Sequence, residues 1–366
     1  TTGFTATNGE GYFCNTNGGA FTVNLPAGSA GAIVSFADYG DNFETNNLTL
    51  SADGSDKING ETLDAKLATT GQSVTLVFVD STEGWITVND SSENVRGNPF
   101  VEATGGTESN CGDFKIHTFT GPGTFTVTKT ACAAGNNVVN YLVVAGGGGS
   151  ARDNAAGAGA GGMRFFGSCV SPSPYPSSPR TAPAGVTVTA SSFPIVIGGG
   201  GAAGPCGGPP GARGSDSSGL GIISTGGGTS IGDGQPSSPL QPGGSGGGRG
   251  QAAGGIGSGN TPPVSPSQGE DGGGDGGNPG GGGGGGGFLN AGSNRSGDNG
   301  GAGGDGGGFP PGHFGASNGV VCGSFRYFAG GGGGGNGQPG SGSGGAGGKG
   351  GGGAGSASSP SCQIAG

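Results

Sequence analysis

The sequence has few of the residues that carry catalysis or metal binding. Of its 366 residues, two are histidine, one is tryptophan and one is methionine. His117 and His313 stand far apart and alone, so no Ser/His/Asp or Cys/His set can be assembled around them. The seven cysteines form no CxxC pair and no Cys/His cluster, which are the usual spacings of a zinc site. The sequence therefore predicts no enzyme, no metal site and no cofactor.

Basic residues and long apolar runs are also scarce. The chain has 13 Lys and Arg against 23 Asp and Glu, a formal net charge of −10, and no basic stripe that would follow nucleic-acid phosphates. No run of about 18 apolar residues is present, so we expect no membrane-spanning helix. The opening TTGFTATNGEGYF has neither the basic nor the apolar region of a secretory signal. Its first Thr fits a processed chain, or a cytosol-made protein that has lost its initiator Met.

Glycine, by contrast, is abundant and unevenly distributed. Residues 1–144 hold only 19 of the 101 glycines, whereas Gly and Pro together make up 102 of the last 222 residues. That share is well above the level of about 25–30% at which low complexity or disorder is expected. We therefore expect four regions: a β-domain over 1–92, a linker over 93–106, a β-hairpin with a third strand over 107–145, and a glycine-rich region over 146–366.

The first region alternates apolar and polar residues in the manner of strands. Its segments are rich in Val, Ile, Thr and Phe and are separated by Gly, Asn and Asp turns. The expected strands are 19–25, 31–39, 46–52, 72–80 and 83–90. This pattern predicts a small antiparallel sandwich or barrel used for attachment or assembly, with Trp85 in its core.

A hairpin is expected over residues 111–132, with its turn at Gly121-Pro122-Gly123. If the turn is centred between 121 and 122, Cys111 lies opposite Cys132. This register favours a disulfide between the two over a pair of free thiols. The sequence assigns no partners to the other cysteines, which are Cys14, Cys169, Cys206, Cys322 and Cys362.

The run Gly280–Gly287 can be interpreted either as a flexible linker or as an ordered extended structure. A flexible linker would explain eight successive glycines, but linkers lack the large aromatic residues that punctuate this half. An extended helix with three residues per turn makes no internal hydrogen bonds, so its main chain must find partners in neighbouring segments. We therefore expect a bundle of such polyglycine-II helices. Short β-strands stay an open alternative, because eight residues only slightly exceed a typical strand.

Several motifs of this half carry a resemblance to a known family. They are HTFTGPGTFTVT, VVNYLVVAGGGG, GAGGMR, FPIVIGGGG, NTPPVSPSQG and YFAGGGGGG. The stretch resembles the glycine-rich domain of tail-fibre and adhesin-like proteins of tailed bacteriophages, those of marine cyanophages in particular. Residues 3–92 are similar to the small β-domain that often precedes it. The resemblance implies a polyglycine-II bundle with host-binding loops at its tip.

The function expected from the resemblance is that of a virion appendage made in the host cytoplasm. Its partners would be other virion proteins, further copies of itself, and a host receptor that is a polysaccharide or an outer-membrane protein. The candidate contact residues are the aromatic and polar groups that interrupt the glycine runs, namely Phe288, Phe309, His313, Phe314, Arg326 and Tyr327. The alternative function is structural, as a virion decoration protein or a self-assembling extracellular filament subunit.

Four aspartates of the glycine-rich region are candidate ligands of an isolated cation. They are Asp271, Asp275, Asp298 and Asp305. The segment 300–305, GGAGGD, matches part of a calcium-binding nonapeptide, but it occurs once and lacks the large apolar residue of that motif. Solvated turn residues are therefore the favoured interpretation.

Overall fold

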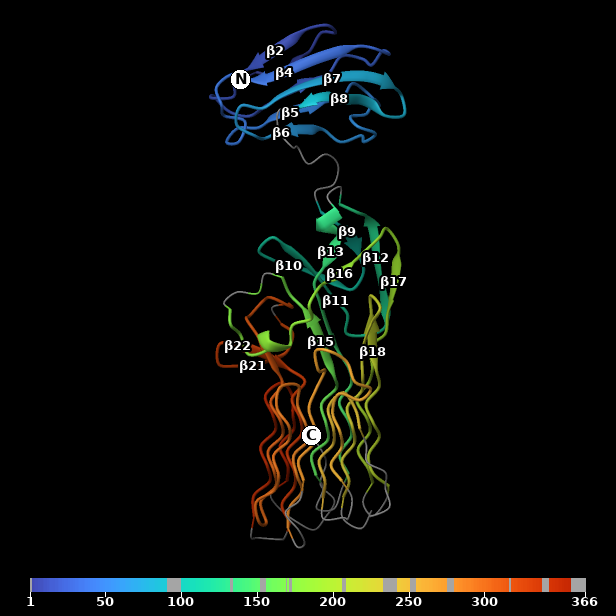
Figure 1. Cartoon of the computed structure of the whole chain (residues 1–366), viewed down its shortest axis with the longest axis vertical. Helices are drawn as coiled ribbons and strands as arrows, with labels where there is room; N and C mark the ends of the chain where they lie inside the picture. The colour runs from blue at the N-terminus through green and yellow to red at the C-terminus, as the bar shows by residue number, and fades with distance from the viewer. Residues whose placement is uncertain are drawn as a thin grey trace. The chain divides into compact units, whose positions relative to one another are not determined.

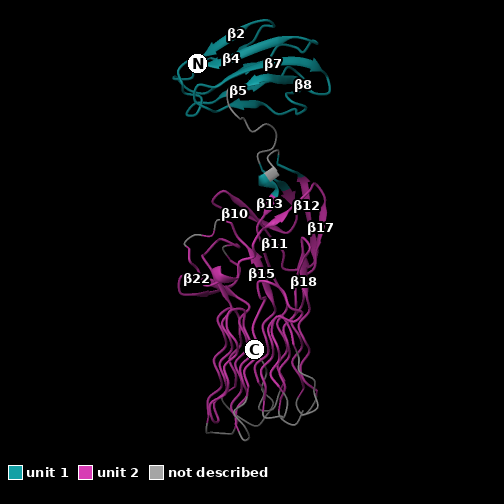
Figure 2. Cartoon of the chain, viewed as in Figure 1, with its two compact units in different colours: residues 1–102, 129–137 teal, residues 103–128, 138–366 magenta. Residues whose placement is uncertain are grey.

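The computed structural model describes residues 2–90, 100–131, 134–151, 156–168, 170, 173–205, 209–232, 242–250, 255–274, 280–315, 317–337 and 342–356. The chain forms two compact units (Figure 2). Unit 1 contains residues 1–102 and 129–137, and unit 2 contains residues 103–128 and 138–366. The regular elements of the described chain are almost all β-strands, as predicted.

Unit 1 contains two four-stranded sheets (Figure 1). One has the order β1-β3-β5-β6, and its strands are Phe4–Thr5, Phe21–Asn24, Leu48–Ser51 and Ala65–Leu67. The other has the order β2-β4-β7-β8, and its strands are Gly11–Cys14, Ile33–Asp38, Ser73–Asp80 and Gly84–Asp90. The five strands expected from sequence are present, and β1, β2 and β6 are additional.

The prediction that these sheets are antiparallel is wrong in part. β3 lies parallel to both β1 and β5, and β2 lies parallel to β4. The reason is that the first five strands alternate between the two sheets, so each sheet receives every second strand in the same direction. Only the later pairs, β4 with β7, β7 with β8 and β5 with β6, are antiparallel.

The core of unit 1 lies between the two sheets. Leu48 and Leu50 of one sheet and Phe36, Leu76 and Trp85 of the other belong to a single buried cluster. Trp85 is fully buried, as the sequence indicated, and its ring meets Phe78 edge-on at 5.6 Å. Cys14 belongs to the same cluster, and burial raises the pKa of its thiol to about 11.

Unit 2 begins with small sheets. They are formed by β9 Glu102–Thr104, β10 Thr107–Cys111, β11 Phe114–Thr118, β12 Gly123–Lys129, β13 Val138–Val139, β14 Tyr141–Val144, β15 Met163–Phe166, β16 Val186–Thr187, β17 Ser192–Ile195, β18 Ser217–Gly219, β19 Ile222–Ser224, β20 Gly307–Phe309, β21 Val320–Cys322 and β22 Phe325–Phe328. Two 3-10 helices are also present, Ala134–Asn137 within the residues assigned to unit 1 and Ser178–Arg180 in unit 2. No helix in the described ranges is long and apolar enough to cross a membrane.

The hairpin predicted over residues 111–132 is wrong in its register. β11 pairs with β10, so that Ile116 lies opposite Ser109 and Cys111 opposite Phe114. β12 instead pairs with β17 and β9. The chain reverses at the two-residue turn Gly112-Asp113, where Gly112 has a positive φ of 56°. A glycine at the first position of a two-residue turn is a recognised hairpin signal, and the sequence contains it at Gly112.

The glycine-rich segments of unit 2 lie side by side as extended chains (Figure 1). Residues 281–287 form no β-strand, yet their main chain is hydrogen-bonded. The N–H groups of Gly282, Gly285 and Phe288 all donate to one neighbour, residues 329–335, over N–O distances of 2.8–3.0 Å. Donors to the same neighbour are thus three residues apart, which is the period of a polyglycine-II helix.

The remaining groups of this run follow the same rule. Two further neighbours accept its N–H groups, residues 246–249 and 290–297, and three others donate to its carbonyls, residues 157–160, 270–273 and 301–304. The run is therefore surrounded by six chains, each bonded to it at intervals of three residues. This arrangement confirms the predicted bundle and gives a partner to every N–H group of residues 281–287 and to every carbonyl of residues 282–287.

Glycine is required in this run because neighbouring main chains occupy the space of a side chain. A Cβ built on Gly283 would overlap the carbonyl oxygen of Gly273, and one on Gly285 would overlap that of Ala158. The few larger residues inside the bundle direct hydroxyl groups at main-chain carbonyls. Thr229 Oγ1 donates to Gly149 O over 2.6 Å, for example.

Candidate functional site

An aromatic cluster is packed where the glycine runs meet the strands of unit 2. Phe309 lies at its centre, with ring centroids of Phe165 at 4.8 Å, Phe314 at 4.9 Å and Phe328 at 6.0 Å. Phe288, the residue that ends the run 280–287, contacts Phe165 at 6.2 Å. Such edge-to-face packing stabilises a core beyond the area it buries.

Most of the candidate contact residues belong to this cluster or support it. Phe288 and Phe309 are 0% and 1% exposed, and Tyr327 is also buried, so their side chains offer no surface to a partner. Phe314 is half-buried against Phe309. The structure thus brings these aromatic residues together, but as the packed end of the bundle.

His313 and Arg326 have different positions at the margin of this cluster. His313 contacts the ring of Phe314 at 4.6 Å, its Nε2 is buried without a hydrogen-bond partner, and burial lowers the pKa of the imidazole. The Arg326 guanidinium donates to the carbonyls of Asn318 and Gly319, both at 3.2 Å. Arg326 therefore holds the turn before β21, while part of its side chain stays accessible.

The segment NTPPVSPSQG, residues 260–269, is anchored by two amide side chains. Asn260 Oδ1 accepts from the N–H of Val264 at 3.1 Å, and its Nδ2 donates to Val264 O at 3.0 Å. Gln268 is fully buried, and its amide group bonds the main chain and the hydroxyl of Thr225. These two anchors give a physical reason for the residues at both ends of a motif that the sequence had only matched by resemblance.

Arg180 connects the end of the glycine run to this part of the molecule. Its Nη2 lies 2.5 Å from Glu270 Oε1 and 3.3 Å from Leu289 O, and its Nη1 donates to Phe288 O. The guanidinium also lies 5.2 Å from the ring centroid of Phe288. Sequence reasoning missed Arg180 and Glu270, because 90 residues separate them and no local motif relates them.

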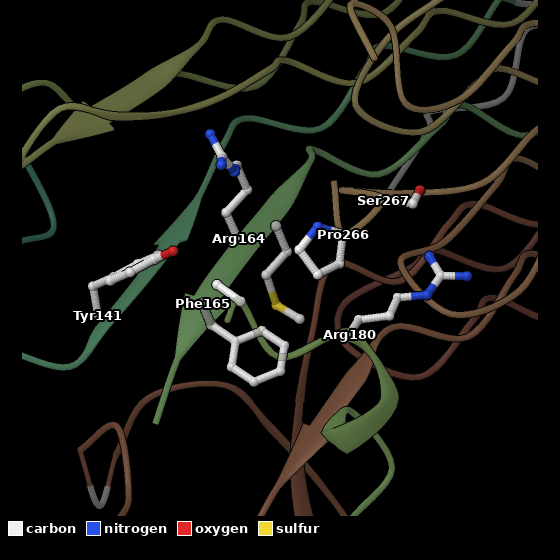
Figure 3. Close-up of a pocket in the computed structure, with 8 residues that line it drawn as sticks. Tyr141, Arg164, Phe165, Arg180, Pro266 and Ser267 are labelled. Atoms are coloured by element: carbon white, nitrogen blue, oxygen red, sulfur yellow. The ribbon is translucent and has the colours of Figure 1, made fainter. Parts of the chain in front are cut away.

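A small pocket lies beside this connection (Figure 3). It is lined by residues that include Tyr141, Phe165 and Pro266, and the side chains of Arg164 and Arg180 extend away from one another around it. Its volume of ≈ 10 Å³ is about the room needed by one water molecule. The pocket is therefore too small for an organic substrate.

The titratable residues of the described ranges do not assemble into a metal site. No group of three or more His, Cys, Asp or Glu side chains is placed to hold an ion there. Asp305 is paired with Lys349, at 2.9 Å between Oδ2 and Nζ, and Asp271 accepts from the N–H of Gly259 at 2.7 Å. Asp298 also has an interaction partner, and Asp275 lies outside the described residues.

The strand register does not support the expected disulfide between Cys111 and Cys132. Cys111 lies opposite Phe114 in the β10–β11 hairpin and carries a free thiol. Cys14 and Cys322 are also free thiols. Cys132 lies outside the described residues, as do Cys169, Cys206 and Cys362.

Comparison with known proteins agrees with the composition of unit 2. A family model described as a glycine-rich domain matches residues 118–365, which is more than half of the chain. A search of curated proteins finds no match.

Proposed function

We propose that this chain, which belongs to the glycine-rich domain family, is a virion appendage, a tail fibre or adhesin, that binds a bacterial host cell surface. The receptor would be a surface polysaccharide or an outer-membrane protein. Other virion proteins and further copies of the chain would be its partners in the particle.

One observation carries this proposal, namely the separation of scaffold from loops in unit 2. The runs of the bundle pack main chain against main chain, so side chains have little room inside it. Variation in side chains is therefore confined to the segments that join the runs. A rigid scaffold with variable connecting loops is the usual arrangement of a recognition protein.

The connecting segment 310–328 offers accessible groups for such recognition. Val320 and Val321 of the edge strand β21 are exposed, Val321 to 63%. Arg326 lies on the adjacent strand β22, directly opposite Val321. Apolar side chains next to an arginine are a common composition at the centre of protein interfaces.

The test is a binding measurement with the labelled full chain on cells of candidate bacterial hosts. We expect the double variant Val320→Ser, Val321→Ser to bind at least about tenfold more weakly than the wild type, because central interface residues carry most of the affinity. The matched control is Leu63→Ser, an exposed apolar residue of unit 1, which should bind like the wild type.

Failure of the folded wild type to bind any host of the parent virus would replace the adhesin proposal by the structural alternative. If it binds and the double variant binds equally well, the contact lies in other loops of the bundle.

A further inference from the structure

The two sheets of unit 1 have outer faces of opposite character. On the sheet β1-β3-β5-β6, the outward residues are polar, among them Thr22, Asn24, Thr49 and Lys66. This is the alternation expected of a sheet that faces water on one side. The sheet β2-β4-β7-β8 departs from it.

The outer face of β2-β4-β7-β8 is apolar over all four strands. We define the apolar face as Phe13, Ile33, Val77, Val79, Ile86 and Val88. Ile33, Val77 and Ile86 form one continuous row, because Val77 pairs with both of the others. Phe13 is 79% exposed and Val88 is 60% exposed.

A polar row of Ser35, Thr75 and Asn89 crosses this face between Phe13 and the row of Ile33, Val77 and Ile86. Ser35 and Thr75, which lie opposite one another between β4 and β7, are hydrogen-bonded through their hydroxyls at 2.9 Å. Charged side chains occur in these four strands only at their ends, at Asp38, Asp80 and Asp90. Apolar side chains therefore lie on both sides of an uncharged polar row, and an apolar surface with few charges is the composition of an interface core.

Charge around the apolar face is predominantly negative; Lys57 lies at the β8 edge of the sheet, where its Nζ donates to Thr82 O over 3.2 Å. Residues 2–90 contain eleven Asp and Glu but only Lys57 and Lys66, a formal net charge of −9. Carboxylates lie at the ends of the same strands, with Glu10 directly before β2, Asp80 at the end of β7 and Asp90 at the end of β8. Lys66 belongs to the other sheet.

We propose that the apolar face of unit 1 docks a different protein, whose matching surface has an apolar centre and a rim of Lys and Arg. A second copy of this chain is disfavoured as the occupant, because two faces within units of net charge −9 would repel each other. A basic rim complements the carboxylates and hastens the encounter. The proposal is independent of cell-surface binding by unit 2.

Site-specific photo-crosslinking of the full chain in the particle or cell that naturally contains it tests the proposal. The crosslinking residue replaces Phe13 or Val88, and Leu63, exposed but outside the apolar face, provides the control position. We expect positions 13 and 88, but not 63, to crosslink to one other protein at a peptide flanked by Lys or Arg. The yield should fall as salt is raised from about 0.1 M to about 0.5 M.

A matched pair at Asn89 tests the charge requirement. Asn89 is exposed on the same sheet, opposite Thr75. Asn89→Lys should lower the crosslinking yield by about fivefold or more, whereas Asn89→Asp should not lower it. Fluorescence of Trp85 reports whether each variant is folded. The effect of salt on the crosslinking yield of the wild type tests the charge requirement without any substitution.

Three outcomes would overturn the proposal. The first is crosslinks that join two copies of this chain or two parts of one chain. The second is a yield at positions 13 and 88 no higher than at 63. The third is a yield that neither the Asn89 pair nor salt changes.

Discussion

At the scale of single residues, Asp38 shows how one carboxylate can organise a turn. It ends β4, and its oxygens accept main-chain N–H groups that include those of Phe43 at 3.0 Å and Gly71 at 3.1 Å. Burial alone would raise the pKa of this carboxyl, but these backbone donors outweigh it and hold the pKa below its usual 3.8. The ionised carboxylate therefore stabilises the folded state of unit 1.

The variant Asp38→Asn should lower the stability of unit 1 by about 1–3 kcal/mol at pH 7, since hydrogen bonds to a charged group are lost. Because the folded-state pKa is depressed, the stabilisation is present above pH 3.8 and is lost as pH falls through the folded-state value. The difference between wild type and variant should therefore shrink in acid. The chain's single tryptophan, Trp85, lies in the core of unit 1, so its fluorescence follows this transition.

The control for this prediction is Asp53→Asn, at an exposed aspartate of the same unit. Its stability should match that of the wild type at both pH values. An equal difference between Asp38→Asn and the wild type at pH 7 and in strong acid would contradict the role assigned to the charge.

In unit 2, Arg180 is a single residue whose charge stabilises the fold, as that of Asp38 does in unit 1. Arg180→Gln removes the ion pair with Glu270 and the donors to the carbonyls of Phe288 and Leu289. We expect a loss of about 1–3 kcal/mol, because main-chain acceptors next to a buried ring are left without a partner. Calorimetry of the full chain should show a lower melting temperature for the transition of unit 2 only.

Arg164→Gln is the matched control for Arg180→Gln. Arg164 lines the same pocket but donates a single hydrogen bond, of 3.4 Å, to Ile223 O. If both variants lower the melting temperature equally, the connection through Glu270 and Phe288 has no special weight.

At the scale of elements, the glycine run 280–287 makes the clearest prediction. Gly283→Val places a branched side chain where the carbonyl of Gly273 already lies, so it should destabilise the bundle by several kcal/mol, in the range of about 4–5 that marks a severe mutation. Gly199→Val is the control, because a Cβ at Gly199 meets nothing within 4 Å. Hydrogen exchange should show faster exchange of amides in residues 281–287 for the first variant and no change for the second.

The sequence predicted elements better than their partners. Alternation identified the strands of unit 1, because each strand has one buried and one exposed face. It could not reveal that successive strands alternate between sheets, which makes β2 and β4 parallel. The prediction of a hairpin over residues 111–132 was wrong for a related reason. The sequence Gly121-Pro122-Gly123 is a stronger turn signal than Gly112-Asp113, where the chain actually reverses.

The candidate site was predictable only in part, and Phe288 and Phe309 show why. Interruption of a glycine run by an aromatic residue is equally consistent with a surface contact and with a plug at the end of the bundle. Burial decides for the plug. Contacts such as Arg180 with Glu270 depend on the packing of distant segments, and no local pattern contains them.

At the scale of the whole molecule, the two units are stabilised in different ways. Unit 1 buries large side chains between two sheets. Unit 2 satisfies its main chain in several directions and concentrates large side chains in a separate aromatic cluster. Mutations should therefore destabilise unit 1 mainly by removing side-chain packing from its core. They should destabilise the bundle of unit 2 mainly by adding a side chain where a glycine now stands.

The three-residue period of the bundle also restricts how such a gene can change in length. One extra codon within the run 280–287 would turn every following residue by about a third of a turn and advance it by about 3 Å, so that Phe288 would leave its place beside Phe165. Three codons would restore the directions and displace the run by about 9 Å along its axis. Insertions and deletions inside the bundle should thus be tolerated mainly in multiples of nine base pairs. Those in the connecting loops should not be restricted to these lengths.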